Sequence, residues 1–146
     1  MMVTENSAAT ASPSALFESF ANVCLFNLGN AVSQADSAKS QGWKLVDEQI
    51  NDDEILLKFE ELNVDILLDT SKTCAITSKV DEKLNFATFT GGISKNLGGS
   101  PPNEVIGSDT AYWLIEPEEQ NETFAISLMV SAKTDANLAT LMISKP

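Results

Sequence analysis

The side chains that usually carry enzymatic chemistry are sparse in this chain. It contains no histidine, and all nine of its cationic side chains are lysines. Without imidazole, the chain lacks the usual general base at neutral pH and the commonest metal ligand. Without guanidinium, it lacks the group that holds phosphates and carboxylates through paired hydrogen bonds. Catalysis would therefore have to use lysine, serine and carboxylates.

Cys24 and Cys74 are the only cysteines. They lie fifty positions apart and neither belongs to a Cys-x-x-Cys pair, so the spacing fits neither a zinc ribbon nor a thioredoxin motif. A catalytic cysteine would lack its usual histidine base. Two interpretations stay open: two buried free thiols, or one disulfide that joins the N-terminal helix to the sheet and stabilises the fold by about 4 kcal/mol.

Three local patterns resemble reactive or binding motifs only superficially. The glycines around Ser94-Lys95 do not have Walker spacing, so a phosphate loop is not predicted. The acidic clusters 51–54 and 116–119 lack the alternating ligands and internal glycine of a calcium loop. Ser71-Lys72 and Ser94-Lys95 are adjacent pairs and do not have the Ser-x-x-Lys spacing of the penicillin-recognising enzymes. We therefore predict no catalytic residue, no metal ligand and no cofactor.

Charge and length limit the class of protein. The chain has 146 residues and a net charge of −12, which repels nucleic-acid phosphates and anionic lipids. No stretch approaches the roughly 20 apolar residues of a membrane-spanning helix. We expect a flexible leader over 1–12 and a single domain over 13–146. The first fifteen residues lack a basic start and an apolar run, which fits a cytosolic chain or the start of a mature exported protein.

Helix signals dominate the N-terminal third. Ser12 followed by Pro13 is typical of a helix start, and apolar residues at helical spacing predict a helix from about 13 to 26. Asn30 can cap a second helix, which Gly42 would end. A third helix is predicted over about 82–97, although its internal Gly91-Gly92 pair disfavours helix and could break it.

Alternating apolar residues predict the strands. They fall in six segments: near 54–59, 64–69, 73–80, 111–116, 123–131 and 138–144. Strands separated by segregated helices favour an α+β fold with an antiparallel sheet of about six strands. The two N-terminal helices and the helix over about 82–97 would pack on one face of this sheet. No internal repeat is strong enough to indicate a duplicated unit.

Three aromatic residues are candidates for ligand or partner contact. Trp43 follows a helix-ending glycine, and Tyr112 and Trp113 lie in an apolar strand. Core packing is the ordinary role of both tryptophans. A tryptophan that faced a cleft would instead provide a flat surface on which a ligand can stack.

Four short motifs lie between Leu16 and Leu114. They are Phe20-x-x-x-Cys24-Leu25, a helix ending in Ala38-x-x-x-Gly42-Trp43, Thr73-Cys74-Ala75-Ile76 and Tyr112-Trp113-Leu114. In these motifs the chain resembles a group of small, uncharacterised exported proteins known mainly from alphaproteobacteria. The resemblance implies export, a Cys24–Cys74 disulfide and an α+β domain, and it implies no activity.

These observations favour a non-enzymatic domain of the cell envelope or a secreted domain. It would bind a protein or small-molecule partner on its sheet or in a groove beside the loop 98–109. It would be periplasmic or secreted, or cytoplasmic if the two cysteines are unpaired. One alternative is a hydrolase-like enzyme that uses carboxylate or Ser/Lys chemistry. The other is a self-associating structural protein, such as a homodimer formed through an edge strand at Leu138–Ser144.

Overall fold

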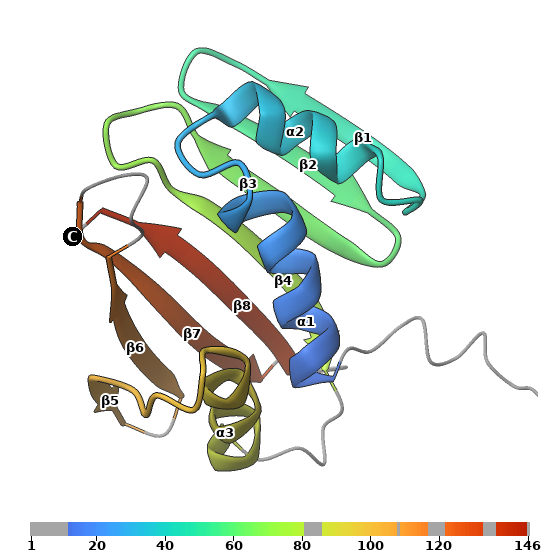
Figure 1. The fold of residues 1–146 in the computed structure, drawn as a ribbon. Coiled ribbons are helices and arrows are strands. Elements are labelled where there is room, and N and C mark those ends of the chain that lie inside the picture. The colour runs from blue at the N-terminus through green and yellow to red at the C-terminus, as the bar shows by residue number, and fades with distance from the viewer. Residues whose placement is uncertain (1–11, 81–85, 108, 117–121, 133–136, 146) are drawn as a thin grey trace, which may run out of the picture.

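The computed structural model describes residues 12–80, 86–107, 109–116, 122–132 and 137–145. These residues form an α+β fold in which helices cover one face of an antiparallel sheet (Figure 1). The predicted fold class is therefore confirmed. The leader predicted over 1–12 lies outside the described residues except for Ser12.

The helices are α1 (Pro13–Phe20), a π-helical turn η2 (Ala21–Leu25) that continues it, α2 (Ala31–Lys39) and α3 (Phe86–Asn96). The side chain of Ser12 accepts a hydrogen bond from the Ala15 amide at 3.1 Å, and that of Asn30 accepts one from the Ser33 amide at 3.0 Å. Such caps satisfy amides of the first turn that have no partner within the helix. The two helices therefore begin where the sequence predicts.

Eight strands form the sheet. They are β1 (Leu45–Ile50), β2 (Glu54–Phe59), β3 (Leu62–Leu67), β4 (Cys74–Val80), β5 (Glu104–Ile106), β6 (Thr110–Ile115), β7 (Phe124–Ala132) and β8 (Asn137–Ser144). Their order is β1-β2-β3-β4-β8-β7-β6-β5, and all neighbours are antiparallel. Each half of the sheet is thus a four-stranded meander preceded by a helix, α2 or α3. The topology of the first half recurs in the second without a recognisable sequence repeat.

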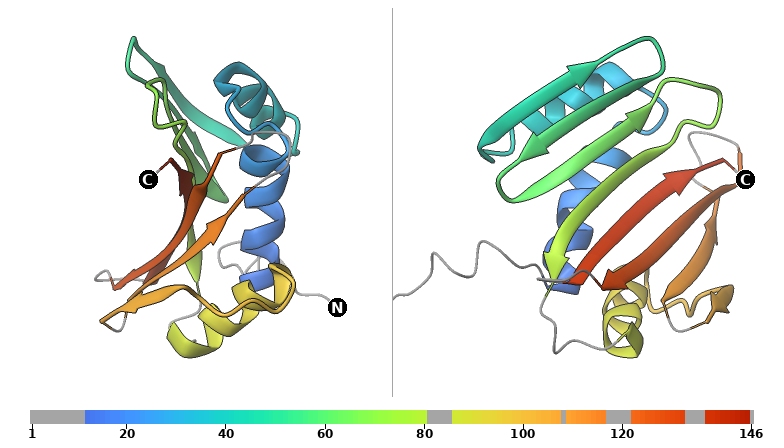
Figure 2. Two further views of the ribbon diagram at one scale, coloured as in Figure 1. Left: turned by 60° about the vertical axis from the view of Figure 1, so that its left-hand side comes forward. Right: turned by 180° about the vertical axis from the view of Figure 1, so that it is seen from behind.

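The core lies between the sheet and the helices. Figure 2 shows all three helices on the same side of the sheet, with the opposite face uncovered. Helix α1 packs across β4 and β8, α2 packs on β3, and α3 packs against α1. The largest fully buried side chains include Trp113, Phe20, Phe89, Phe124, Leu16, Leu57, Ile66 and Leu141. Because strand side chains alternate between faces, the residues between the buried ones form the open face.

The sheet has two strands that the sequence did not predict, and one predicted strand lies elsewhere. β1 is an edge strand whose six residues are all exposed, and β5 has only three residues. Neither strand shows the alternating burial that identifies a half-buried strand. Leu138–Ser144, expected at an edge, instead lies in the centre, paired with both β4 and β7. It offers no free edge for the homodimer proposed from the sequence.

Helix α3 runs through Gly91 and Gly92 without a break. Residues 82–85, where the sequence places its first turn, lie outside the described part of the chain. The two glycines differ in their surroundings. A Cβ at Gly92 would lie 2.5 Å from the Pro13 Cβ, whereas a Cβ at Gly91 would have no neighbour within 4 Å. Gly92 therefore permits the close approach of α3 to the start of α1.

We expect opposite effects from the same substitution at these adjacent positions. Gly91→Ala should raise the free energy of unfolding by about 1 kcal/mol, because alanine favours helix over glycine. Gly92→Ala should lower it by about 1 to 3 kcal/mol, because the new methyl group must displace the rigid ring of Pro13. Urea unfolding of the two variants measures both values. Equal shifts in the two variants would contradict this account of the α1–α3 contact.

Candidate functional site

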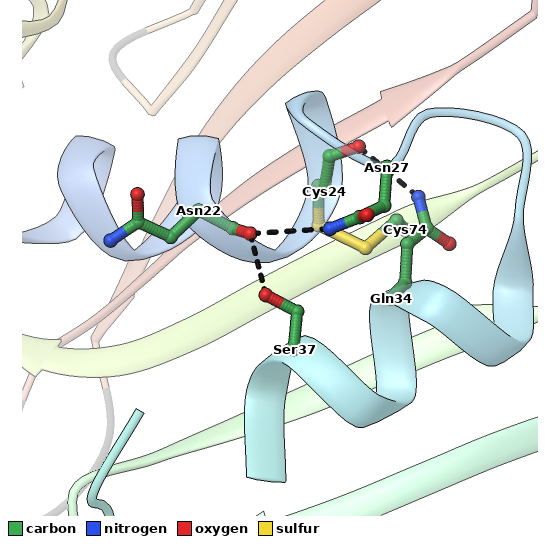
Figure 3. Close-up of a disulfide and its surroundings, with 6 residues drawn as sticks. All are labelled: Asn22, Cys24, Asn27, Gln34, Ser37 and Cys74. Carbon is green, nitrogen blue, oxygen red and sulfur yellow. Dashed lines mark hydrogen bonds between the residues drawn. A yellow bond between two sulfur atoms is a disulfide. The ribbon is translucent and has the colours of Figure 1, made fainter. Parts of the chain in front are cut away.

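A disulfide joins Cys24 in η2 to Cys74, the first residue of β4 (Figure 3). The two Cα atoms lie 5.6 Å apart, within the usual range for a disulfide, and neither residue is exposed. The bridge resolves the alternative left open by the cysteine spacing, and the disulfide that the resemblance implies is confirmed. It attaches the N-terminal helix to a central strand of the sheet.

Helix α2 satisfies backbone oxygens around the bridge. The Ser37 hydroxyl donates to the Asn22 carbonyl at 2.8 Å, and the Gln34 amide donates to the Cys24 carbonyl at 3.1 Å (Figure 3). Gln34 is only 2% exposed. Because a buried carbonyl without a partner is costly, these bonds hold α2 and η2 together beside the disulfide. The buried bridge and the bonds beside it are thus a structural centre of the fold.

The open face of the sheet differs in charge between its two halves. On β2 and β3 it carries Glu54, Lys58 and Asp65, with Asp47 opposite Lys58 on β1. Across β8, β7 and β6 the side chains between the buried residues are neutral. They are Leu138, Thr140, Met142, Ser144, Ala125, Ser127, Met129, Ser131, Thr110, Tyr112 and Leu114. An uncovered sheet face with this composition is a candidate binding surface.

A groove of about 620 Å³ lies on this neutral half. It is lined by Asn103, Glu104, Ile106, Tyr112, Leu114, Ala125, Ser127, Met142 and Ser144. Two other hollows, of about 240 and 150 Å³, are smaller. Sites for small ligands typically have volumes of about 300 to 1,000 Å³ and mainly apolar walls with a few polar groups. The groove has both properties.

Three hydroxyl groups line the groove without a hydrogen-bond partner among the residues that the structure describes. They belong to Tyr112 and Ser144, which are half-buried, and to Ser127, which is only 4% exposed. In contrast, Asn103 is already engaged, since its side-chain oxygen accepts from the Leu114 amide at 2.9 Å. The groove therefore combines apolar walls with unpaired hydroxyl groups.

Asp65 has an unusual environment on the charged half of the open face. One of its carboxylate oxygens is shielded from solvent and has no hydrogen-bond partner in the described part of the chain. Burial, a hydrogen bond with the Glu54 carboxyl group and the negative charge of that group raise the pKa of Asp65 to about 6. Asp65 on β3 pairs with Ala75 on β4, and Ala75 pairs in turn with Met142 on β8, so one strand lies between Asp65 and the nearest residue of the groove in this row. This carboxyl pair therefore does not line the groove.

The three aromatic candidates have different locations. Trp113 is 1% exposed, and its indole N–H lies 3.2 Å from both the Ser94 hydroxyl and the Ser100 carbonyl. Trp43 is half-buried and packs edge-on against Phe59, with ring centroids 5.4 Å apart. Only Tyr112 lines the groove. Both tryptophans thus have the core role that is ordinary for them.

Ser71 and Lys72, which the sequence offered as a possible serine–lysine pair, bond to other residues instead of to each other. The Ser71 hydroxyl bonds to the Asp69 carboxylate, which lowers the pKa of Asp69, and Lys72 pairs with Glu122 at 3.2 Å. Among the described residues, no group of three or more potential ligands could hold a metal ion. The acidic cluster 116–119 lies beyond the described part of the chain except for Glu116.

Sequence reasoning missed most residues of the groove. Glu104, Ile106 and Met142 did not stand out individually, because glutamate, isoleucine and methionine have no distinctive spacing here. A signal was nevertheless present, since the lining residues recur two positions apart on four strands, as in 104 with 106 and 142 with 144. This spacing becomes informative only when the strand order is known.

The fold and the groove define the class: an α+β domain with a disulfide-anchored helix and an open sheet face. Comparisons with protein-family models, with curated proteins and with solved structures found no match for the chain. Within the described residues, no helix is long and apolar enough to cross a membrane.

We expect the disulfide to make a large contribution to stability. Replacing both Cys24 and Cys74 by alanine should lower the free energy of unfolding by about 4 kcal/mol, because the unfolded chain gains the entropy of an open loop of this length. Urea unfolding with and without a reductant measures the loss. The reductant should destabilise the wild-type chain and leave the double variant unchanged; a wild-type chain insensitive to complete reduction would contradict the expectation.

Asp65 should make stability fall as the pH rises. Its pKa is raised in the folded state, so the folded chain binds the proton more tightly than the unfolded chain. Stability from this group is present at low pH and is lost as the pH rises from about 4 through about 6. Asp65→Asn should stabilise the fold at pH 8 by about 1 kcal/mol, after allowance for the partial solvent exposure of the side chain.

Urea unfolding of Asp65→Asn and wild type between pH 5 and pH 8 tests this. The difference between the two chains should shrink toward pH 5. Asp52→Asn is the matched control, because it removes one negative charge from an exposed turn. If Asp52→Asn gives the same pH-dependent gain, general charge repulsion explains the effect and the environment of Asp65 does not.

Proposed function

We propose that the chain is a non-enzymatic binding domain that holds a small apolar ligand on the open face of its sheet. The single observation that carries this proposal is the groove of about 620 Å³ on the neutral half of that face. Its volume falls within the range of small-ligand sites, and its free hydroxyls can orient a bound molecule. The loop before β5 contributes Asn103 to the rim.

The enzyme alternative has less support. An active site should bring titratable groups with shifted pKa values together in a pocket. The carboxyl with a raised pKa, Asp65, lies outside the groove, and the groove itself contains one carboxyl group, that of Glu104. A lone carboxylate beside neutral hydroxyls fits ligand positioning better than acid–base catalysis.

The periplasm or the extracellular space is the proposed location. The buried Cys24–Cys74 bridge supports this proposal, because disulfides persist mainly in oxidising compartments. The resemblance to exported alphaproteobacterial proteins points the same way. A ligand-binding domain in this setting would meet its ligand outside the cytoplasm.

Binding of the neutral, apolar dye Nile red tests the proposal. We expect its fluorescence to rise and saturate with one site per chain. Leu114→Asp should weaken binding by at least about tenfold, because a charge would replace part of the apolar wall. Leu114 is 52% exposed, so the variant should fold, which urea unfolding can verify.

Val46→Asp is the matched control. Val46 is also an exposed apolar strand residue, at 63%, but it lies on β1, at the opposite edge of the sheet from β5. It should bind the dye like the wild type. Absence of saturable binding, or equal losses in the two variants, would contradict a binding site in the groove.

A further inference from the structure

We infer that the ligand of the groove is an amphiphilic cation: a molecule with an apolar body and a positively charged head group that lies against Glu104 and Tyr112. This inference rests on the proposed function and goes beyond it, because it names the chemistry of the ligand. It depends on four features: the pairing of these two residues, the charge of the surroundings, the apolar walls and the structure of the rim.

Glu104 and Tyr112 are direct cross-strand partners on β5 and β6. Both line the groove, so their side chains lie on the same face of the sheet. Directly opposed side chains have Cβ atoms about 5 Å apart, which brings a carboxylate beside an aromatic ring. A cation bound there meets the negative charge of Glu104 and the electron-rich face of the tyrosine ring. Such a pair suits a quaternary or primary ammonium group.

No positive charge competes for this carboxylate within the groove. None of the lining residues is a lysine, and Glu104 takes part in no ion pair within the described residues. The chain as a whole has a net charge of −12. A cationic ligand is therefore attracted both by the local carboxylate and by the field of the protein, whereas an anion is repelled by both.

The remaining walls fit an apolar body. Ile106 and Leu114 are 48% and 52% exposed, and Met142 lines the groove from β8, where Ser127 of β7 separates it from Tyr112. Burying this surface against an alkyl or aromatic group is favourable, while a small inorganic cation would leave it in water. The groove thus selects a molecule with both a charged and an apolar part.

The rim of the groove beside β5 is held by backbone and side-chain hydrogen bonds. The outer edge of β6 is already paired with β5, and beyond that strand the Asn103 amide donates to the Tyr112 carbonyl at 2.7 Å. The Asn103 side chain then accepts from the Leu114 amide. Hydrogen bonds therefore fix the backbone of the rim where Asn103, β5 and β6 meet, beside Glu104 and Tyr112.

Three octyl amphiphiles that differ only in the head group test the inference. Calorimetric titrations below their micelle concentrations should use octyltrimethylammonium, octyl glucoside and octyl sulfate. We expect the cation to bind at least about tenfold more tightly than the glucoside, and the sulfate to bind more weakly than the glucoside. Glu104→Gln should remove most of the preference for the cation, because only Tyr112 and the net charge of the protein then attract it, and should leave the affinity for the glucoside unchanged.

Glu116→Gln is the control for general charge attraction. It makes the same change of charge at an exposed residue just after β6 that does not line the groove. It should leave the preference for the cation intact. If the cation binds no better than the glucoside, or if Glu104→Gln and Glu116→Gln have equal effects, the inference is overturned while the groove still stands as an apolar site. If neither the glucoside nor Nile red binds, the proposed function itself fails.

Discussion

The pairing of β4 with β8 is the interaction on which the rest of the structure depends. Seven residue pairs join the two meanders there, and the hydroxyls of Thr77 and Thr140, 63 positions apart, lie 2.9 Å from each other across the seam. Helix α1 covers the inner side of this seam, and the disulfide attaches η2 to the first residue of β4. Because all the described helices lie on that side, no described helix covers the opposite face, which carries the groove.

Local signals in the sequence predicted the helix starts and most of the strands. Ser12 and Asn30 act as caps through their own side chains, and alternating apolar residues follow directly from burial of one sheet face. The sequence did not predict β1, whose exposed residues bury neither face, or the central place of β8. Strand order depends on which distant segments pair, and periodicity within one strand contains no information about its partner.

The candidate site could be predicted only in part for the same reason. Tyr112 stood out as an aromatic residue, but Glu104 became relevant only because β5 places it opposite Tyr112. The composition of the groove is likewise a property of four strands together. Each strand contributes two ordinary residues, such as Ala125 with Ser127, and their common surface appears only after the meander has folded.

The position of the disulfide has a consequence for the order of folding when the chain enters an oxidising compartment N-terminus first. Both cysteines precede residue 80, so the bridge can close before the second meander has arrived. At that stage the first meander already has its disulfide, but the edge of β4 that later pairs with β8 is still unpaired. Such edges promote association with other chains. The first meander therefore gains its disulfide early, but the edge of β4 stays open to association with other chains until β8 pairs with it.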